Sequence, residues 1–159
     1  MATAGEPEPK ADEPSPAKAD YAKCSKEAER RSQKYREVDP FPDIHRALLS
    51  SEHIKAYVRE TGMIYPFDDD ANRGALKSAS YEARAAGQFI YWDEHGKKVV
   101  QPITKDGIFT LKPNSISFVQ IESQFRLPQY IAVRFNLRIT HVHRGLLLGG
   151  TVAICVGID

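Results

Sequence analysis

An alternating stretch near the end of the printed sequence constrains the fold of this chain more than any other feature. Apolar side chains occupy every second position from Ile131 to Ile139, and small or polar ones lie between them. Successive side chains of a strand point to opposite faces, so the pattern predicts a half-buried strand over residues 131–140. The strand leads into a Gly-bounded turn with cationic and hydroxyl side chains, namely Arg138, Thr140, His141, His143 and Arg144. These groups favour an anion site, although a solvated strand followed by a basic turn has the same pattern.

The rest of the second half is also typical of β structure. β-Branched and aromatic residues dominate from residue 88 onward, with turn residues between them and prolines at the boundaries. We expect short strands at residues 89–92, 97–100, 107–111, 115–121, 131–140 and 151–156, the first two joined by a hairpin turn at 93–96. This pattern predicts a mostly antiparallel β domain. Before it, Ser50 or Ser51 caps a helix that ends near Gly62 and carries Ile54, Tyr57 and Val58 on one face.

The N-terminal part is not built to pack. Residues 1–20 contain Pro, Ala, Glu, Lys and Asp with no large apolar residue after Met1, which predicts a disordered tail. Residues 21–42 form a polar linker with helical character, closed by Pro40 and Pro42. Residues 43–159 are then the one folded domain. No apolar run is long enough for a signal peptide or a membrane span, so we expect no membrane partner.

Charge and cysteine content narrow the function classes. The net charge of +1 gives no field that recruits nucleic acid, so we expect no nucleic-acid partner. Cys24 and Cys155 are too few for a disulfide framework and fit a reducing, cytoplasmic location. His141 and His143 lie on the expected extended segment and point to the same side, but no third ligand accompanies them, so we expect no metal site and no zinc. Asp68–Asp70 is interpreted as a solvated loop.

Four segments of the chain resemble the dCTP deaminase/dUTPase superfamily. Leu76 to Trp92 (LKSASYEARAAGQFIYW) is similar to the family segment A-S-x-D-x-R-L-G, with Glu82 where Asp is usual. Phe109 to Pro113 resembles the aromatic-x-L-x-P strand opening, and Val119 to Pro128 resembles the passage that ends in L-P. Arg138 to Leu148 resembles the strand end and the Arg/Ser turn followed by Gly and Leu.

The resemblance implies a fold, an activity and partners. The fold is a distorted jelly-roll-like β-clip barrel, here incomplete, with a short N-terminal helical part. The activity is hydrolytic deamination of dCTP to dUTP in pyrimidine deoxynucleotide metabolism, that is, dUTP biosynthesis. The alternatives are a dUTP diphosphatase-like enzyme and a non-catalytic nucleotide-binding or interaction domain. In the family the deoxynucleoside triphosphate is bound with Mg²⁺, without zinc, at sites shared between the subunits of a homotrimer.

The resemblance also carries candidate residues for nucleotide binding. Aligning on Arg144 places Thr140 at a family serine and Arg144 at the catalytic-turn arginine. Aligning on Gly145 instead places Arg138 and His143 at the two family arginines, and both registers stay open. We expect binding to weaken in Arg144→Ala. Glu82 and Glu122 are interpreted as structural or solvent-facing, and no catalytic base is assigned.

The match departs at Gly149 and Gly150. The family continues with a D-P-G-aromatic motif and the strands that bear the acidic catalytic residue, whereas this sequence reads GGTVAICVGID. We therefore expect a truncated family member, for which a frameshift is one origin, that binds the nucleotide weakly and releases no detectable ammonia or pyrophosphate.

Overall fold

The computed structural model describes residues 16–45, 47–70, 74–104 and 107–149. The helices in these ranges are α1 (Pro16–Lys34), α2 (Ser51–Thr61) and α3 (Ile139–Val142). The strands are β1 (Ile64–Tyr65), β2 (Leu76–Lys77), β3 (Ser80–Tyr81), β4 (Ala85–Trp92), β5 (Lys98–Pro102), β6 (Ser117–Ile121) and β7 (Gln124–Phe125).

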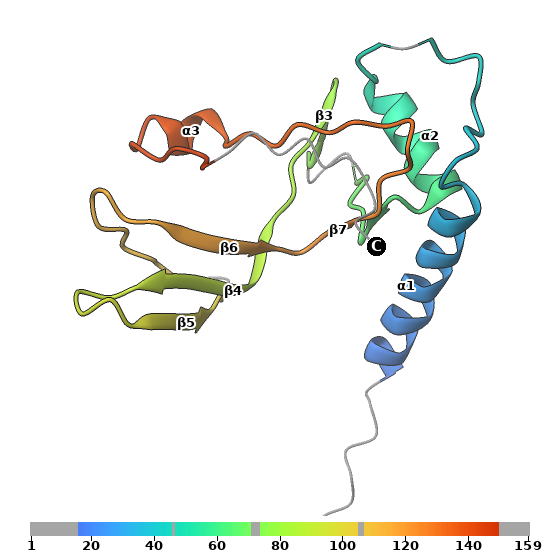
Figure 1. Cartoon of the computed structure of the whole chain (residues 1–159). Helices are drawn as coiled ribbons and strands as arrows, with labels where there is room; N and C mark the ends of the chain where they lie inside the picture. The colour runs from blue at the N-terminus through green and yellow to red at the C-terminus, as the bar shows by residue number, and fades with distance from the viewer. Residues whose placement is uncertain (1–15, 46, 71–73, 105–106, 150–159) are drawn as a thin grey trace, which may run out of the picture.

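The strands form three separate antiparallel sheets. β1 pairs with β7, β2 pairs with β3, and β4 lies between β5 and β6. In Figure 1, α1 and α2 lie at one end of the molecule, and the β5-β4-β6 sheet lies at the other. The expected mainly β architecture with few helices is confirmed at this level. Among the described residues the sheets do not close into a barrel, and the jelly-roll-like fold stays a prediction.

Helix α2 has the boundaries that the sequence predicts. The Ser50 side chain accepts a hydrogen bond from the His53 backbone N–H (3.3 Å), which satisfies one of the free donors of the first turn. Gly62 ends the helix in the left-handed conformation (φ 67°), and its N–H donates to the Val58 carbonyl. A Cβ at Gly62 would lie 2.4 Å from the Ala28 carbonyl oxygen of α1. The glycine therefore serves both the turn and the close approach of α1.

The described hydrophobic core surrounds α2. It consists of Tyr57, Val58, Met63 and Ile64, all at most 5% exposed. Aromatic and aliphatic side chains from later parts of the chain pack against it, including Phe125, Leu127, Tyr130 and Ile131. The Tyr57 hydroxyl donates to both carboxylate oxygens of Asp39 (3.0 and 3.1 Å), so the polar end of this buried ring is satisfied.

The predicted strand over residues 131–140 is wrong. Residues 131–138 are extended but form no ladder beyond an isolated bridge at Arg134, and residues 139–142 form the short helix α3. The alternation itself is present: Ile131, Val133, Phe135 and Leu137 are half-buried, and the residues between them are exposed. The alternation therefore predicts correctly which side chains of this segment face inward. A β-strand also needs a neighbouring strand for its backbone hydrogen bonds, and the alternation does not provide one.

The other expectations have mixed outcomes. The hairpin around residues 93–96 and the strand near 115–121 are confirmed as β4–β5 and β6. Residues 107–111 contain no strand. Helix α1 begins at Pro16, inside the predicted tail, and continues into the predicted linker. Residues 1–15 and the expected strand at 151–156 lie outside the described residues.

One face of the β5-β4-β6 sheet carries exposed apolar side chains. Ile90 lies directly between Val100 and Phe118 across the three strands, and Trp92 follows on the same face of β4. The Trp92 and Phe118 rings meet at 5.9 Å, yet Trp92, Val100 and Phe118 are 43%, 46% and 58% exposed. We call these four residues the apolar sheet face. The opposite face buries Phe89, which packs on Phe109 at 4.6 Å.

Helix α1 is the longest helix of the described residues, and it is polar. None of the helices in this part of the chain is both long enough and apolar enough to cross a membrane.

Candidate functional site

The turn that the sequence marks for anion binding is built around α3. The Arg138 carbonyl accepts hydrogen bonds from the backbone N–H groups of His141 (2.9 Å) and Val142 (3.3 Å), which closes one helical turn. Gly145 ends the turn with φ 82°, a conformation that favours glycine. The turn thus reverses the extended segment and places its first residues beside the connection from β3 to β4.

A cavity of about 300 Å³ lies where these two segments meet. Its lining residues are Ala75, Glu82, Ala83, Arg84, Ala85, Arg138 and His141. The backbone on one side is held by two hydrogen bonds, from the Glu82 N–H to the Ala75 carbonyl and from the Glu122 N–H to the Arg84 carbonyl, both 2.8 Å. We call this space the Arg138 cavity.

The structure brings only one of the four predicted nucleotide-binding residues to the Arg138 cavity. Arg138 lines it, whereas Thr140, His143 and Arg144 do not and are exposed. His141 is half-buried and lines the cavity instead. The expectation that His141 and His143 lie on an extended segment is wrong, because the first is in α3 and the second is its C-cap.

Arg84 and His141 line the cavity but are not among the four residues that the resemblance predicts to bind the nucleotide. Arg84 lies in the segment that resembles A-S-x-D-x-R-L-G, so the matched arginine was the signal that marked this position. His141 belongs to the cationic cluster of the turn, but its placement in the cavity depends on the helical turn that replaces the expected strand.

The charged groups that line the cavity take part in two separate sets of ion pairs. Arg138 Nε lies 3.6 Å from Glu82 Oε1, and Lys77 Nζ lies 3.9 Å from Glu82 Oε2. Arg84 donates to Asp68 Oδ2 at 3.0 Å. Two guanidinium groups and one carboxylate therefore line the cavity. This arrangement, with a half-buried imidazole, is suited to an anion with several oxygens.

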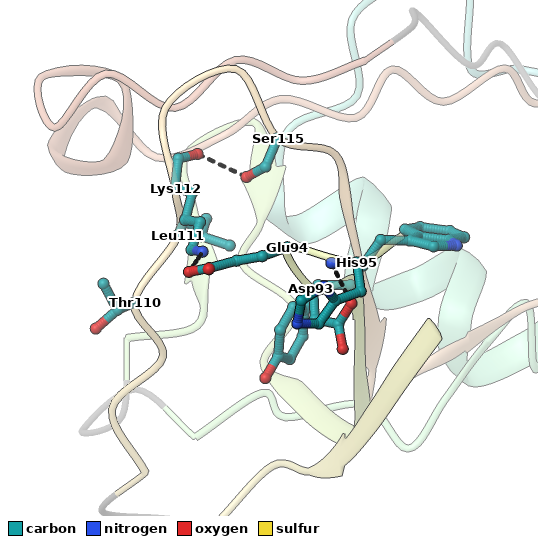
Figure 2. A pocket seen from close by; sticks show the side chains of 9 residues that line it. Asp93, Glu94, His95, Thr110, Leu111, Lys112 and Ser115 are labelled. Atoms are coloured by element: carbon teal, nitrogen blue, oxygen red, sulfur yellow. Dashed lines mark hydrogen bonds and ion pairs between the residues drawn. The ribbon is translucent and has the colours of Figure 1, made fainter. Parts of the chain in front are cut away.

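A second cavity, of about 360 Å³, lies between the β4–β5 turn and residues 110–115 (Figure 2). Figure 2 shows the Lys112 ammonium and the Glu94 carboxylate pointing toward one another, and they form an ion pair. The hydrogen bond from Lys112 lowers the pKa of the Glu94 carboxyl. Asp93 Oδ1 accepts from the backbone N–H groups of His95 and Lys97 (2.9 Å each). These polar groups satisfy one another and fix the hairpin turn.

Neither cavity is arranged to hold a metal ion by protein side chains. Within residues 16–45, 47–70, 74–104 and 107–149, no group of three or more His, Cys, Asp or Glu side chains is close enough to ligate one. The segment Asp68–Asp70 contributes ion pairs instead, from Asp68 to Arg84 and from Asp69 to Arg59.

Comparison with known proteins gives two relatives. The chain is 27% identical over 119 residues to a dCTP deaminase of Erythrobacter litoralis, covering 66% of this chain and 65% of the relative. It is 28% identical over 117 residues to a dCTP deaminase of Gluconobacter oxydans, covering 65% and 64%. The chain is dCTP deaminase/dUTPase-like.

The likeness to the two dCTP deaminases covers only part of each protein. The match spans just under two thirds of the length of either dCTP deaminase. No family model matches the chain, and no solved structure matches it. The dCTP deaminase-like assignment therefore rests on the two relatives, and the placement of the site rests on the geometry of the Arg138 cavity.

Proposed function

We propose that this chain is a dCTP deaminase-like protein of pyrimidine deoxynucleotide metabolism that binds the triphosphate of dCTP in the Arg138 cavity. The observation that carries the proposal is the meeting of two family-like segments in one place. Residues 82–85 come from the first segment, and Arg138 and His141 come from the last, and together they line a cationic cavity.

Each cationic side chain of the cavity has a proposed role. Arg138 is 63% exposed and is held only by a long ion pair, so it is free to turn its guanidinium toward phosphate oxygens. Arg84 also lines the cavity and is held by its ion pair with Asp68. The His141 ring supplies one further hydrogen-bond donor. A charge-assisted hydrogen bond contributes about 1.5–3 kcal/mol, so two such contacts correspond to dissociation constants from about millimolar to tens of micromolar.

Mg²⁺ is proposed to arrive with the nucleotide. The cavity has one carboxylate, Glu82, which is too few for a protein-held magnesium site. A magnesium ion coordinated by the phosphate oxygens of the triphosphate needs no further protein carboxylate. We therefore treat the Mg²⁺–triphosphate complex as the ligand.

Deamination is the proposed reaction at the family level: water adds at C4 of the cytosine ring, and ammonia leaves, so that dCTP and water give dUTP and ammonia. The step needs a base that takes a proton from the water. Glu82 is the carboxylate of the cavity, but it is ion-paired with Arg138 and Lys77. This pairing favours a second candidate function, nucleotide binding without turnover.

A homo-oligomer is proposed as the working form. The apolar sheet face exposes three large side chains, and such a surface favours burial against another protein surface. In the described residues β5 and β6 each have one edge without a paired strand, which another chain can cover.

Calorimetric titration of the full chain with dCTP and MgCl₂ tests the proposal. We expect weak binding of dCTP that inorganic triphosphate competes away, because the proposed contacts are to phosphate. In the same sample, an ammonia assay separates the two candidate functions, since only the deaminase releases ammonia. Absence of dCTP binding up to concentrations of tens of millimolar would exclude both candidates.

A further inference from the structure

Glu82 is the one acidic side chain among the residues that line the Arg138 cavity. Its two carboxylate oxygens face different cations, Arg138 Nε at 3.6 Å and Lys77 Nζ at 3.9 Å. Both distances exceed those of a hydrogen bond, so Glu82 holds its partners by charge alone. The Glu82 side chain is 33% exposed and the Arg138 side chain 63% exposed. The pair between them is therefore solvated and weak.

An anion in the cavity needs the same guanidinium that Glu82 faces. A phosphate that approaches Arg138 also approaches the Glu82 carboxylate, and like charges at this range repel each other. Binding therefore becomes easier when Arg138 turns away from Glu82. Lys77 lowers the cost of this exchange, because its ammonium remains beside Glu82 after Arg138 has left.

We propose that Glu82 competes with phosphate anions for Arg138 and thereby weakens anion binding in the cavity. This inference rests on the proposed triphosphate site. Any phosphate that binds Arg138 must displace the Glu82 carboxylate first, and the free-energy cost of this step is the same for every phosphate ligand. Glu82 thus lowers the apparent affinity of the cavity for phosphates without itself contacting the ligand.

The first test is titration of the full chain with inorganic triphosphate and, separately, inorganic phosphate. Glu82→Gln removes the charge and keeps the shape, and we expect triphosphate to bind up to about fivefold tighter, the range that an exposed ion pair allows. Phosphate should gain by the same factor, because the cost of freeing Arg138 from Glu82 does not depend on the ligand. Glu94→Gln is the matched control, because it breaks an exposed Glu–Lys pair outside the Arg138 cavity and should leave both affinities unchanged.

The second test separates competition for Arg138 from simple charge repulsion. If Glu82 acts through Arg138, then Glu82→Gln has no effect on residual triphosphate binding in an Arg138→Ala background. An equal gain in both backgrounds contradicts the competitor role and assigns the effect to general repulsion. Unchanged or weaker binding in the single variant Glu82→Gln also overturns the proposal.

The third test needs no ligand and keeps this inference apart from the proposed function. An arginine-selective dicarbonyl reagent, followed by peptide mass spectrometry, measures how freely Arg138 reacts. We expect faster modification of Arg138 in Glu82→Gln and an unchanged rate at Arg30, which pairs with Glu27 in α1. An unchanged rate at Arg138 overturns the competitor role. If Arg138 reacts faster in Glu82→Gln but triphosphate binds to no variant, the proposed function is wrong, whereas the contact between Glu82 and Arg138 is confirmed.

Discussion

The helical end of the molecule and the β5-β4-β6 sheet differ in how well they bury their apolar side chains. Around α2, Tyr57, Val58, Met63 and Ile64 are at most 5% exposed, and side chains from before and after α2, between residues 41 and 131, pack on them. In the sheet, Phe89 alone is buried to this degree, and Trp92 and Phe118 are largely exposed. The same chain therefore contains one region that is complete by itself and one that is not.

This difference indicates that the α2 core stabilises the fold and that the candidate site lies in the less packed region. The α2 core supplies the free energy that holds the described fold together, since burial of apolar area is the main favourable contribution to folding. The sheet and α3 contribute less to that core. The Arg138 cavity lies beside β4 and α3, on the less packed side, where a change in side-chain position costs little.

The largest expected effect comes from a matched pair of aromatic truncations. Tyr57→Ala should destabilise the chain by about 3–5 kcal/mol, because it leaves a cavity in the core and removes the partner of Asp39. Phe118→Ala, on the apolar sheet face, should cost less than about 1 kcal/mol in the monomer because the ring is 58% exposed. Urea unfolding of both variants at low protein concentration measures the difference. Similar losses in the two variants would contradict the contrast between the regions.

A second comparison uses two glycines with the same backbone conformation. Alanine at Gly62 (φ 67°) or Gly96 (φ 72°) would have a strained backbone, which lowers the free energy of unfolding by about 1–2 kcal/mol at each position. At Gly96 the added Cβ meets nothing within 4 Å, whereas at Gly62 it lies 2.4 Å from the Ala28 carbonyl oxygen. Gly62→Ala should therefore cost more than Gly96→Ala and make α1 more sensitive to protease. Equal unfolding free energies would show that α1 does not pack on α2 in solution.

Alkaline pH should destabilise the helical end. Burial, followed by the hydrogen bond and the charge of Asp39, raises the pKa of Tyr57 to about 12 from 10.0. Burial and the charge of Asp39 also raise the pKa of Tyr130 to about 12. A raised phenol pKa gives stability that is present below pH 10 and is lost as the pH rises toward 12. Unfolding free energies between pH 8 and 12 test this, with a smaller loss expected in Tyr57→Phe, and a flat profile would show that neither ring is buried.

A substitution on the apolar sheet face should have the smallest effect on stability but a clear effect on assembly. The sequence contains one tryptophan, Trp92, so its fluorescence reports on this face alone. If copies of the chain cover the face, Trp92 emission shifts to shorter wavelength as the protein concentration rises, and Phe118→Ser abolishes the shift. Light scattering on the same samples gives the mass. A monomer with concentration-independent emission would leave the proposed homo-oligomer without support.

The sequence allowed some elements to be predicted because their signals are local. Helix α2 has its cap residue, its apolar face and its terminal glycine within one short stretch, and the β4–β5 hairpin has its turn residues between two apolar runs. The segment at residues 131–138 has an equally clear pattern but does not pair. Whether an extended segment becomes a strand depends on a neighbour elsewhere in the chain, which the pattern of one segment does not contain.

In the candidate site, too, the sequence predicted what depends on local signals and not what depends on tertiary neighbours. The resemblance and the clustered cations marked the turn at residues 138–144 for nucleotide binding, and of the four residues predicted to bind, Arg138 is the one that lines the cavity. They could not separate Arg138 from Arg144, because that choice depends on the helical turn of α3, which directs the two side chains differently. The grouping of Glu82, Arg84 and His141 with Arg138 is tertiary and has no local signature.

The binding of dCTP by two arginine variants tests the central claim most directly. Arg138 lines the cavity and Arg144, six residues later on the same turn, does not, so the two substitutions remove the same charge from different places. With MgCl₂ present, Arg138→Ala should weaken dCTP binding about tenfold or more, the loss of one charge-assisted contact, and Arg144→Ala should weaken it less than about twofold. Circular dichroism confirms that both variants are folded. Equal affinities of Arg138→Ala and the unmodified chain, or a larger loss in Arg144→Ala, would contradict the placement of the triphosphate in the Arg138 cavity.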